Sequence, residues 1–215
     1  MEETNDATMK KEENVPLLLE GAGKRLERVL SGNNNTGIND PGKSVRRWLG
    51  TSSGIAKQAT LNDVGIAAQG LLPTSCAGRE YLVPYITTPP PLKEESDSGV
   101  LESVSDEMEA WFLSLAVRCL VQDERYQEAW KLIQMSIHNV IHEQKKTKPS
   151  MHPLTARLYR YYGWVSEKAG QNLDRTLLMD AHREASLRRD VDTSATILIL
   201  LLRHLLQNHQ GKHPI

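Results

Sequence analysis

The chain has 215 residues, 26 of them basic and 27 acidic, so its formal net charge at pH 7 is -1. This length suits one or two domains with a sizeable core, and this charge excludes a global attraction to nucleic acid or to an anionic membrane. Two cysteines give no framework of disulfides, and residues 1–14 contain no apolar signal region. We therefore expect a soluble intracellular protein.

The first part of the chain predicts a tail, linkers and short helices. Residues 1–43 are expected to be a disordered tail and linker, because they are largely polar and include a Gly/Asn run; they hold one short helical patch at Val15–Leu30. Residues 44–88 carry apolar residues without a clear period, so only short helices are expected, with a break at residues 51–54. A proline-rich, acidic linker is expected at residues 89–102.

Residues 103–209 show the periodicity of a helical-repeat domain. Apolar residues recur at helical spacing in five segments, namely 105–121, 126–141, 154–169, 174–189 and 192–207. Short links make neighbouring helices antiparallel, and Gly170 is expected to end the third one. No convincing strand is present. The predicted fold class is all-α, with stacked antiparallel helical hairpins in a tetratricopeptide-like α-solenoid after a disordered N-terminal tail.

The last predicted helix is apolar on nearly all sides. Asp192 or Thr193 is the expected N-cap, and leucine and isoleucine dominate the residues that follow. The apolar run is too short to span a bilayer, and a helix that is apolar all round needs protein on all sides. We therefore expect this helix to need a protein partner. The residues expected to bind it are Leu198, Leu201, Leu202 and Leu205.

Residues 37–44 match the P-loop pattern G-x-x-x-x-G-K-[ST]. Such a loop needs a buried strand before it and a helix after it, so that backbone N–H groups and the lysine point at phosphates. The preceding residues 31–36 are Gly- and Asn-rich and cannot form a core strand. We interpret the match as a coincidence within a linker and keep nucleotide binding as a weaker alternative.

Other residues with suitable chemistry form no convincing site. His138 and His142 have the spacing of two zinc ligands, but Asn139 stands where a zincin needs glutamate, and no third ligand is evident. Cys119 lies among apolar residues, which favours a small buried hydrophobe over a nucleophile. We expect no enzyme activity, cofactor, metal or small-molecule substrate. Five aromatic residues are expected in the core rather than on a stacking platform for single-stranded nucleic acid: Trp111, Trp130, Tyr161, Tyr162 and Trp164.

Three blocks carry a family resemblance. Residues 70–86 place a small-residue turn before an aromatic and leucine-containing segment ending Pro84-Tyr85-Ile86, and residues 109–133 contain Arg125-Tyr126-Gln127-Glu128-Ala129. Residues 156–206 run from a Tyr/Arg-rich helix through a basic turn to a helix containing Leu-Leu-Arg. In these blocks the chain resembles the N-terminal portion of the proteasome lid family called non-ATPase regulatory subunit three, a PCI-type helical-repeat family. Thr193-Ser194 departs from the family's usual Gly-Gln.

The resemblance implies a non-catalytic scaffold of the proteasome regulatory particle. Such a subunit supports ubiquitin-dependent protein degradation by contacting other lid subunits in cytoplasm and nucleus, and has no nucleic-acid or membrane partner. The PCI winged-helix part is expected to be absent. A subunit of a related PCI complex (the signalosome or a translation initiation factor) is a near alternative. A free-standing tetratricopeptide-like adaptor, or a nucleotide-binding protein using residues 37–44, would belong to another class.

Overall fold

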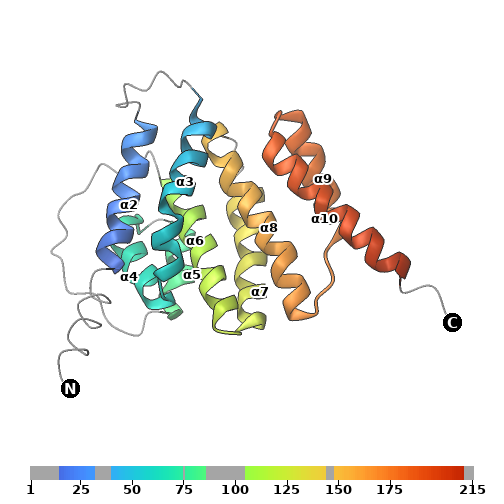
Figure 1. The fold of residues 1–215 in the computed structure, drawn as a ribbon, viewed down its shortest axis with the longest axis horizontal. Coiled ribbons are helices and arrows are strands. Elements are labelled where there is room, and N and C mark those ends of the chain that lie inside the picture. The colour runs from blue at the N-terminus through green and yellow to red at the C-terminus, as the bar shows by residue number, and fades with distance from the viewer. Residues whose placement is uncertain (1–14, 32–39, 75, 86–104, 144–147, 211–215) are drawn as a thin grey trace.

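The described part of the molecule consists of helices. The computed structural model describes residues 15–31, 40–74, 76–85, 105–143 and 148–210. Within these ranges no strand forms, and the helices lie side by side from α2 at one end of the molecule to α9 and α10 at the other (Figure 1). The predicted all-α class with stacked helical hairpins is confirmed.

Helix α2 (Val15–Leu30) is the helical patch predicted within residues 1–43, and this prediction is confirmed. Its buried residues recur every three or four positions, and it packs against α3 (Pro41–Gln58) and α4 (Leu61–Leu71). The indole N–H of Trp48 in α3 donates to the carbonyl oxygen of Ala22 in α2 at 3.0 Å. This packing supplies the stabilisation that a short isolated helix lacks.

Helix α3 continues through residues 51–54, so the predicted break is wrong. The hydroxyl of Ser52 donates to the Trp48 carbonyl oxygen at 2.9 Å, which satisfies the hydroxyl inside the helix. Val45, Trp48, Ser52 and Ala56 form one buried stripe along the helix. Burial of this stripe outweighs the weak helix propensity of the serines and glycines on its other faces.

Helix α6 (Ser105–Gln122) lies at the centre of the stack. It is buried throughout residues 107–117. Helices α4, α5 (Ala77–Leu82), α7 (Tyr126–Met135) and α8 (His152–Ala169) all pack against it. The tight turn between α6 and α7 includes Glu124 in the left-handed conformation, with φ 59°.

One hydrophobic core joins the helices on both sides of residues 86–104. The carboxylate of Glu109 in α6 accepts the Gly78 N–H at the start of α5 (Ala77–Leu82) at 2.6 Å. The short helix η1 (Val83–Tyr85) follows α5. The predicted linker at residues 89–102 lies outside the described residues, so the division into a segment 44–88 and a domain 103–209 stays a prediction.

The helix predicted over residues 126–141 changes geometry after Met135. There α7 ends and the chain continues as the π-helix η3 (Ser136–Glu143). The Ser136 hydroxyl donates to the Leu132 carbonyl oxygen at 2.7 Å where the geometry changes. The same type of bond from Ser52 leaves α3 unbroken, so this bond alone does not explain the change. Beyond residues 144–147, which are not described, the turn η4 (Pro149–Met151) leads directly into α8.

The C-terminal hairpin consists of α9 (Arg175–Leu187) and α10 (Val191–Gln210). Gly170 ends α8 in the left-handed conformation with φ 63°, as predicted. Asp174 caps α9, and Arg189, with φ 57°, reverses the chain between α9 and α10. Helix α10 packs against both α8 and α9, so this hairpin closes one end of the stack (Figure 1).

Candidate protein-binding face on the last helix

One side of α10 is packed inside the protein. Ile197 and Leu200 on this side are buried. Gly163 of α8 lies directly beneath Leu200, because a Cβ atom added to Gly163 would lie 2.2 Å from Leu200 Cδ2. Glycine is therefore the residue that allows α8 and α10 to approach so closely.

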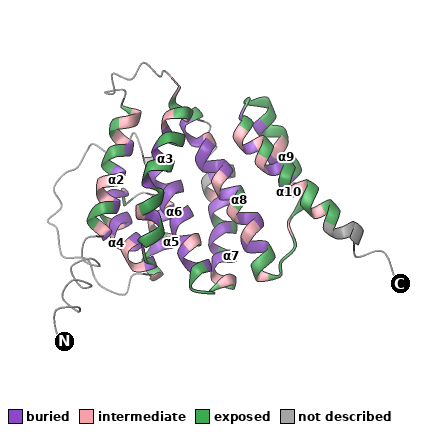
Figure 2. Ribbon diagram, in the orientation of Figure 1, coloured by how far each residue is buried: buried purple, intermediate pink, exposed green. Residues whose placement is uncertain are grey.

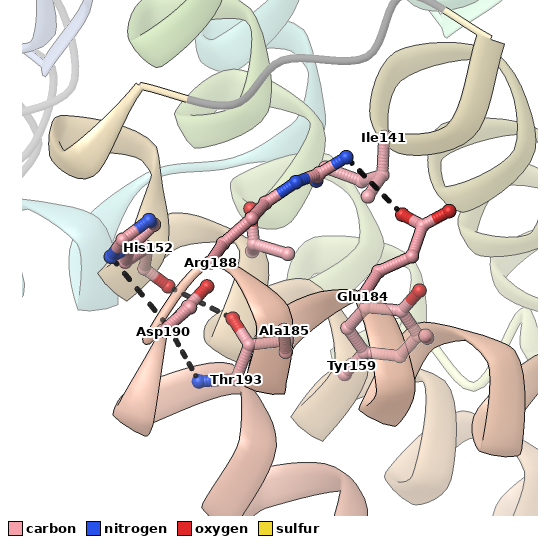
Figure 3. Close-up of a pocket in the computed structure, with 10 residues that line it drawn as sticks. Ile141, His152, Tyr159, Glu184, Ala185, Arg188, Asp190 and Thr193 are labelled. Carbon is pink, nitrogen blue, oxygen red and sulfur yellow. Dashed lines mark hydrogen bonds and ion pairs between the residues drawn. The ribbon is translucent and has the colours of Figure 1, made fainter.

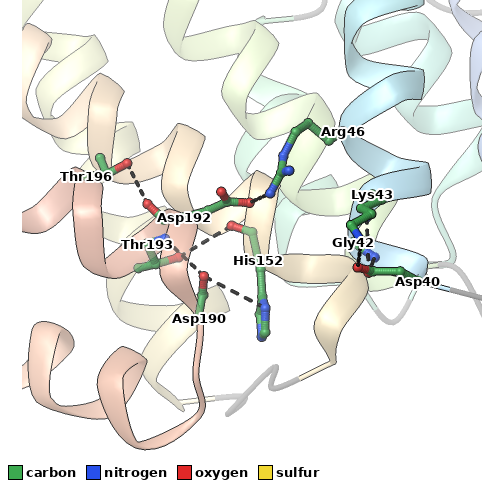
Figure 4. Close-up of polar contacts among 9 residues, drawn as sticks. All are labelled: Asp40, Gly42, Lys43, Arg46, His152, Asp190, Asp192, Thr193 and Thr196. Atoms are coloured by element: carbon green, nitrogen blue, oxygen red, sulfur yellow. Dashed lines mark hydrogen bonds and ion pairs between the residues drawn. The ribbon is translucent and has the colours of Figure 1, made fainter.

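Polar contacts hold the start of α10 in place (Figure 4). The Asp190 carboxylate accepts the Thr193 N–H at 3.0 Å. Asp190 therefore provides the capping side chain, and the predicted N-cap at Asp192 or Thr193 is wrong. The chain reverses at Arg189, so α10 already begins at Val191. Asp190 also lies 3.8 Å from His152 Nδ1 at the start of α8. Asp192 instead forms an ion pair with Arg46 of α3.

A small cavity of about 30 Å³ lies beside these contacts (Figure 3). The ion pair between Arg188 and Glu184, at 3.4 Å, is part of its wall. Burial raises the pKa of Tyr159, another lining residue, far above its ordinary value, so its phenol stays neutral. A cavity of this volume has room for water rather than for a metabolite.

The other side of α10 is exposed (Figure 2), and the large side chains there are apolar. Five large side chains there have exposed fractions of 42% to 63%, and we call them the α10 face: Leu198, Ile199, Leu202, Leu205 and Leu206. An open groove of about 200 Å³ runs between this side of α10 and α9. We call it the α9–α10 groove, and its lining consists of Arg175, Met179, Leu198, Leu201, Leu202, His204 and Leu205.

Three of the four residues predicted to bind a partner belong to the α10 face, and the fourth, Leu201, is partly buried in the α9–α10 groove. Ile199 and Leu206 are not among the predicted residues, although their spacing from Leu202 shows that they share its side of a helix. Met179 is not among them either, because it belongs to α9 and joins the groove only through tertiary packing. Partner binding by these residues remains a prediction.

The P-loop match has an aspartate at the position that a phosphate would need. Asp40 accepts the N–H groups of Gly42 at 3.0 Å and Lys43 at 3.2 Å at the start of α3. The bond from the Lys43 N–H is the main cause that holds the pKa of Asp40 below its usual value. A carboxylate bound to these N–H groups repels a second anion. Residues 37–39 lie outside the described part of the chain.

The remaining candidate residues are placed as follows. Trp111, Trp130 and Tyr162 are buried, as predicted, whereas Tyr161 and Trp164 are partly exposed beside the core. Cys119 is a buried hydrophobe, as predicted, and its burial raises the pKa of its thiol to about 11.

Metal-binding and membrane-spanning features can be assessed for the described residues only. His138 is exposed on η3, and the side chain of His142 is outside the described residues, so their pairing is not tested. Across the ranges that the structure describes, no group of three or more His, Cys, Asp or Glu residues could hold a metal ion. None of the helices in these ranges has the length and hydropathy to cross a membrane.

The fold and the α10 face define a protein of the tetratricopeptide-like class, in which helical hairpins stack and present surfaces to other proteins. A family model described as "PSMD3-like, N-terminal TPR repeats" matches residues 84–213, which is more than half of the chain. The chain belongs to this family.

Two curated relatives agree with this assignment. The probable 26S proteasome regulatory subunit rpn3 of Schizosaccharomyces pombe is 27% identical over 172 residues, covering 78% of this chain and 34% of the relative. The 26S proteasome non-ATPase regulatory subunit 3 of Dictyostelium discoideum is 30% identical over 117 residues, covering 54% of this chain and 22% of the relative. The chain therefore spans about a third or less of the length of these relatives.

Proposed function

We propose that the chain is a non-catalytic scaffold subunit of the proteasome regulatory particle lid. It supports ubiquitin-dependent protein degradation through protein–protein contacts, in cytoplasm and nucleus. The observation that carries the proposal is the exposed α10 face at the end of the stack. Family membership and the names of the two relatives support the choice of complex.

Exposed apolar side chains are concentrated at this end of the molecule. Of the twelve exposed large hydrophobic residues in the described part of the chain, eight lie in the α9–α10 hairpin. Full burial of one such side chain in an interface would contribute about 1.5–3 kcal/mol to the free energy of binding. A contiguous apolar patch of this kind is typical of a protein-binding site. By contrast, α8 is covered by α10, and α6 by α8. Binding of another protein over the α10 face would bury these exposed side chains.

Co-purification from cells tests the proposal. The full chain is tagged and captured, and bound proteins are quantified by mass spectrometry for the wild type, Leu202→Lys and Leu17→Lys. Leu17 in α2 is the matched control, because its side chain is as exposed as that of Leu202: the exposed fractions are 58% and 59%. We expect regulatory-particle subunits with the wild type and the control, and about tenfold less with Leu202→Lys, since a charge would replace a leucine that the partner covers.

Two outcomes would contradict the proposal. Full recovery with Leu202→Lys would show that the α10 face is not the contact surface. Capture of a partner outside the proteasome, with no regulatory-particle subunit, would favour the free-standing adaptor instead. Circular dichroism of each variant excludes unfolding as the cause of a loss.

A further inference from the structure

We propose that the α9–α10 groove receives one amphipathic helix of a partner protein, and that carboxylates flank the apolar stripe of this helix. This inference rests on the proposed function, because it names the partner chemistry for the same surface. It is carried by the shape of the groove, by the kind of residue that lines it and by the sign of its charge.

The shape of the groove fits a helix. It follows two antiparallel neighbouring helices, and its α10 wall extends from Leu198 to Leu205. Seven residues of helix correspond to roughly 10 Å, or two turns. A partner helix with apolar residues at i, i+3, i+4 and i+7 presents a stripe of the same length. The groove floor is apolar over this whole length, with Met179 on the α9 side.

The charge of the groove selects among possible occupants. Among the described residues that line it, Arg175 and His204 are the ionisable ones, and none carries a carboxylate. Arg175 is exposed, and it lies near the C-terminal half of α10 because α9 runs antiparallel to α10. The neighbouring Arg203 already faces Glu167 of α8 at 3.4 Å. A partner with an aspartate or glutamate beside its apolar stripe would therefore pair with Arg175.

The same charges disfavour a second copy of this chain in the groove. Two copies would bring two Arg175 guanidinium groups into one interface, with no carboxylate among the described residues of either groove lining. Like charges at an interface oppose association and select against such a partner. The observations thus favour a different chain with acidic flanks.

Two synthetic peptides test this inference on the full chain. Each is a labelled amphipathic helix of about four turns with a leucine stripe; one has glutamates beside the stripe and the other has lysines. Binding is measured by fluorescence anisotropy at low and high salt. We expect the glutamate peptide to bind roughly three- to tenfold more tightly at low salt, and the preference to shrink as salt screens the charges.

Charge-reversal variants locate the preference. Arg175→Glu should reverse it, whereas Arg47→Glu, an exposed arginine of α3, should preserve it. Leu202→Lys should lower the affinity of the chain for both peptides. Equal binding of the two peptides, or a preference unaffected by Arg175→Glu, would overturn the inference. Either result could coexist with capture of regulatory-particle subunits through Leu202, so the proposed function would stand; failure of that capture would reject the function whatever the peptides do.

Discussion

At the scale of single residues, glycine has opposite roles in neighbouring helices. Gly163 lies where α8 and α10 meet, and a Cβ there would lie 2.2 Å from Leu200. Gly50 and Gly54 lie in the middle of α3, and a Cβ at either position would meet no atom within 4 Å. The first glycine permits a close helix contact, whereas the other two only make the unfolded chain more flexible.

This contrast predicts opposite effects of alanine. Gly50→Ala and Gly54→Ala should each raise the free energy of unfolding by about 0.5–1 kcal/mol, because they improve helix propensity without a clash. Gly163→Ala should lower it by about 1–3 kcal/mol, because Leu200 must move. Urea unfolding followed by circular dichroism measures all three. Destabilisation by Gly50→Ala would show that α3 does not extend through residues 51–54 as described.

At the scale of elements, the starts of α3 and α10 are fixed by aspartates that precede them. Asp40 binds two N–H groups of α3, and Asp190 binds one of α10. Asp190 is buried and also faces His152, whereas Asp192 pairs with Arg46. These contacts connect the C-terminal hairpin to helices much earlier in the chain.

Loss of the Asp190 cap should loosen the hairpin. Asp190→Ala should lower the free energy of unfolding by about 1–2 kcal/mol, because the Thr193 N–H loses its acceptor. Asp180→Ala is the control: Asp180 is exposed on α9, and its replacement should change the value by less than about 0.5 kcal/mol. Denaturant titration of both variants measures the difference. Equal, small effects would mean that Asp190 does not hold α10.

The same geometry predicts that residues 37–44 bind no nucleotide. Asp40 already binds the N–H groups that would hold a phosphate, and its charge opposes a second anion. Labelled ATP or GTP with magnesium should show no micromolar affinity for the chain, and Lys43→Ala should not alter the measured nucleotide binding. Micromolar binding that Lys43→Ala abolishes would instead establish the nucleotide-binding alternative.

Across the whole molecule, local patterns predicted the helices of residues 105–207 well, and tertiary packing decided the rest. Periodicity and short links are local, so α6, α8, α9 and α10 are found where expected. The full length of α3 depends on burial of Trp48 against α2, which the sequence of α3 alone does not reveal. The candidate site was predicted by composition, but which side of α10 stays exposed follows from its contact with α8 and α9.

Sedimentation velocity of the purified full chain tests the central claim most directly: that the α10 face is left for another protein to cover. Without a partner, we expect weak, concentration-dependent association that strengthens with salt, because burial of the leucines favours contact while repulsion between the Arg175 side chains of two copies opposes it. Leu198→Lys and Leu205→Lys should each reduce the association, and Leu17→Lys should not. A wild-type chain that sediments as a monomer at all concentrations, with low binding of a dye for apolar surfaces, would contradict the claim.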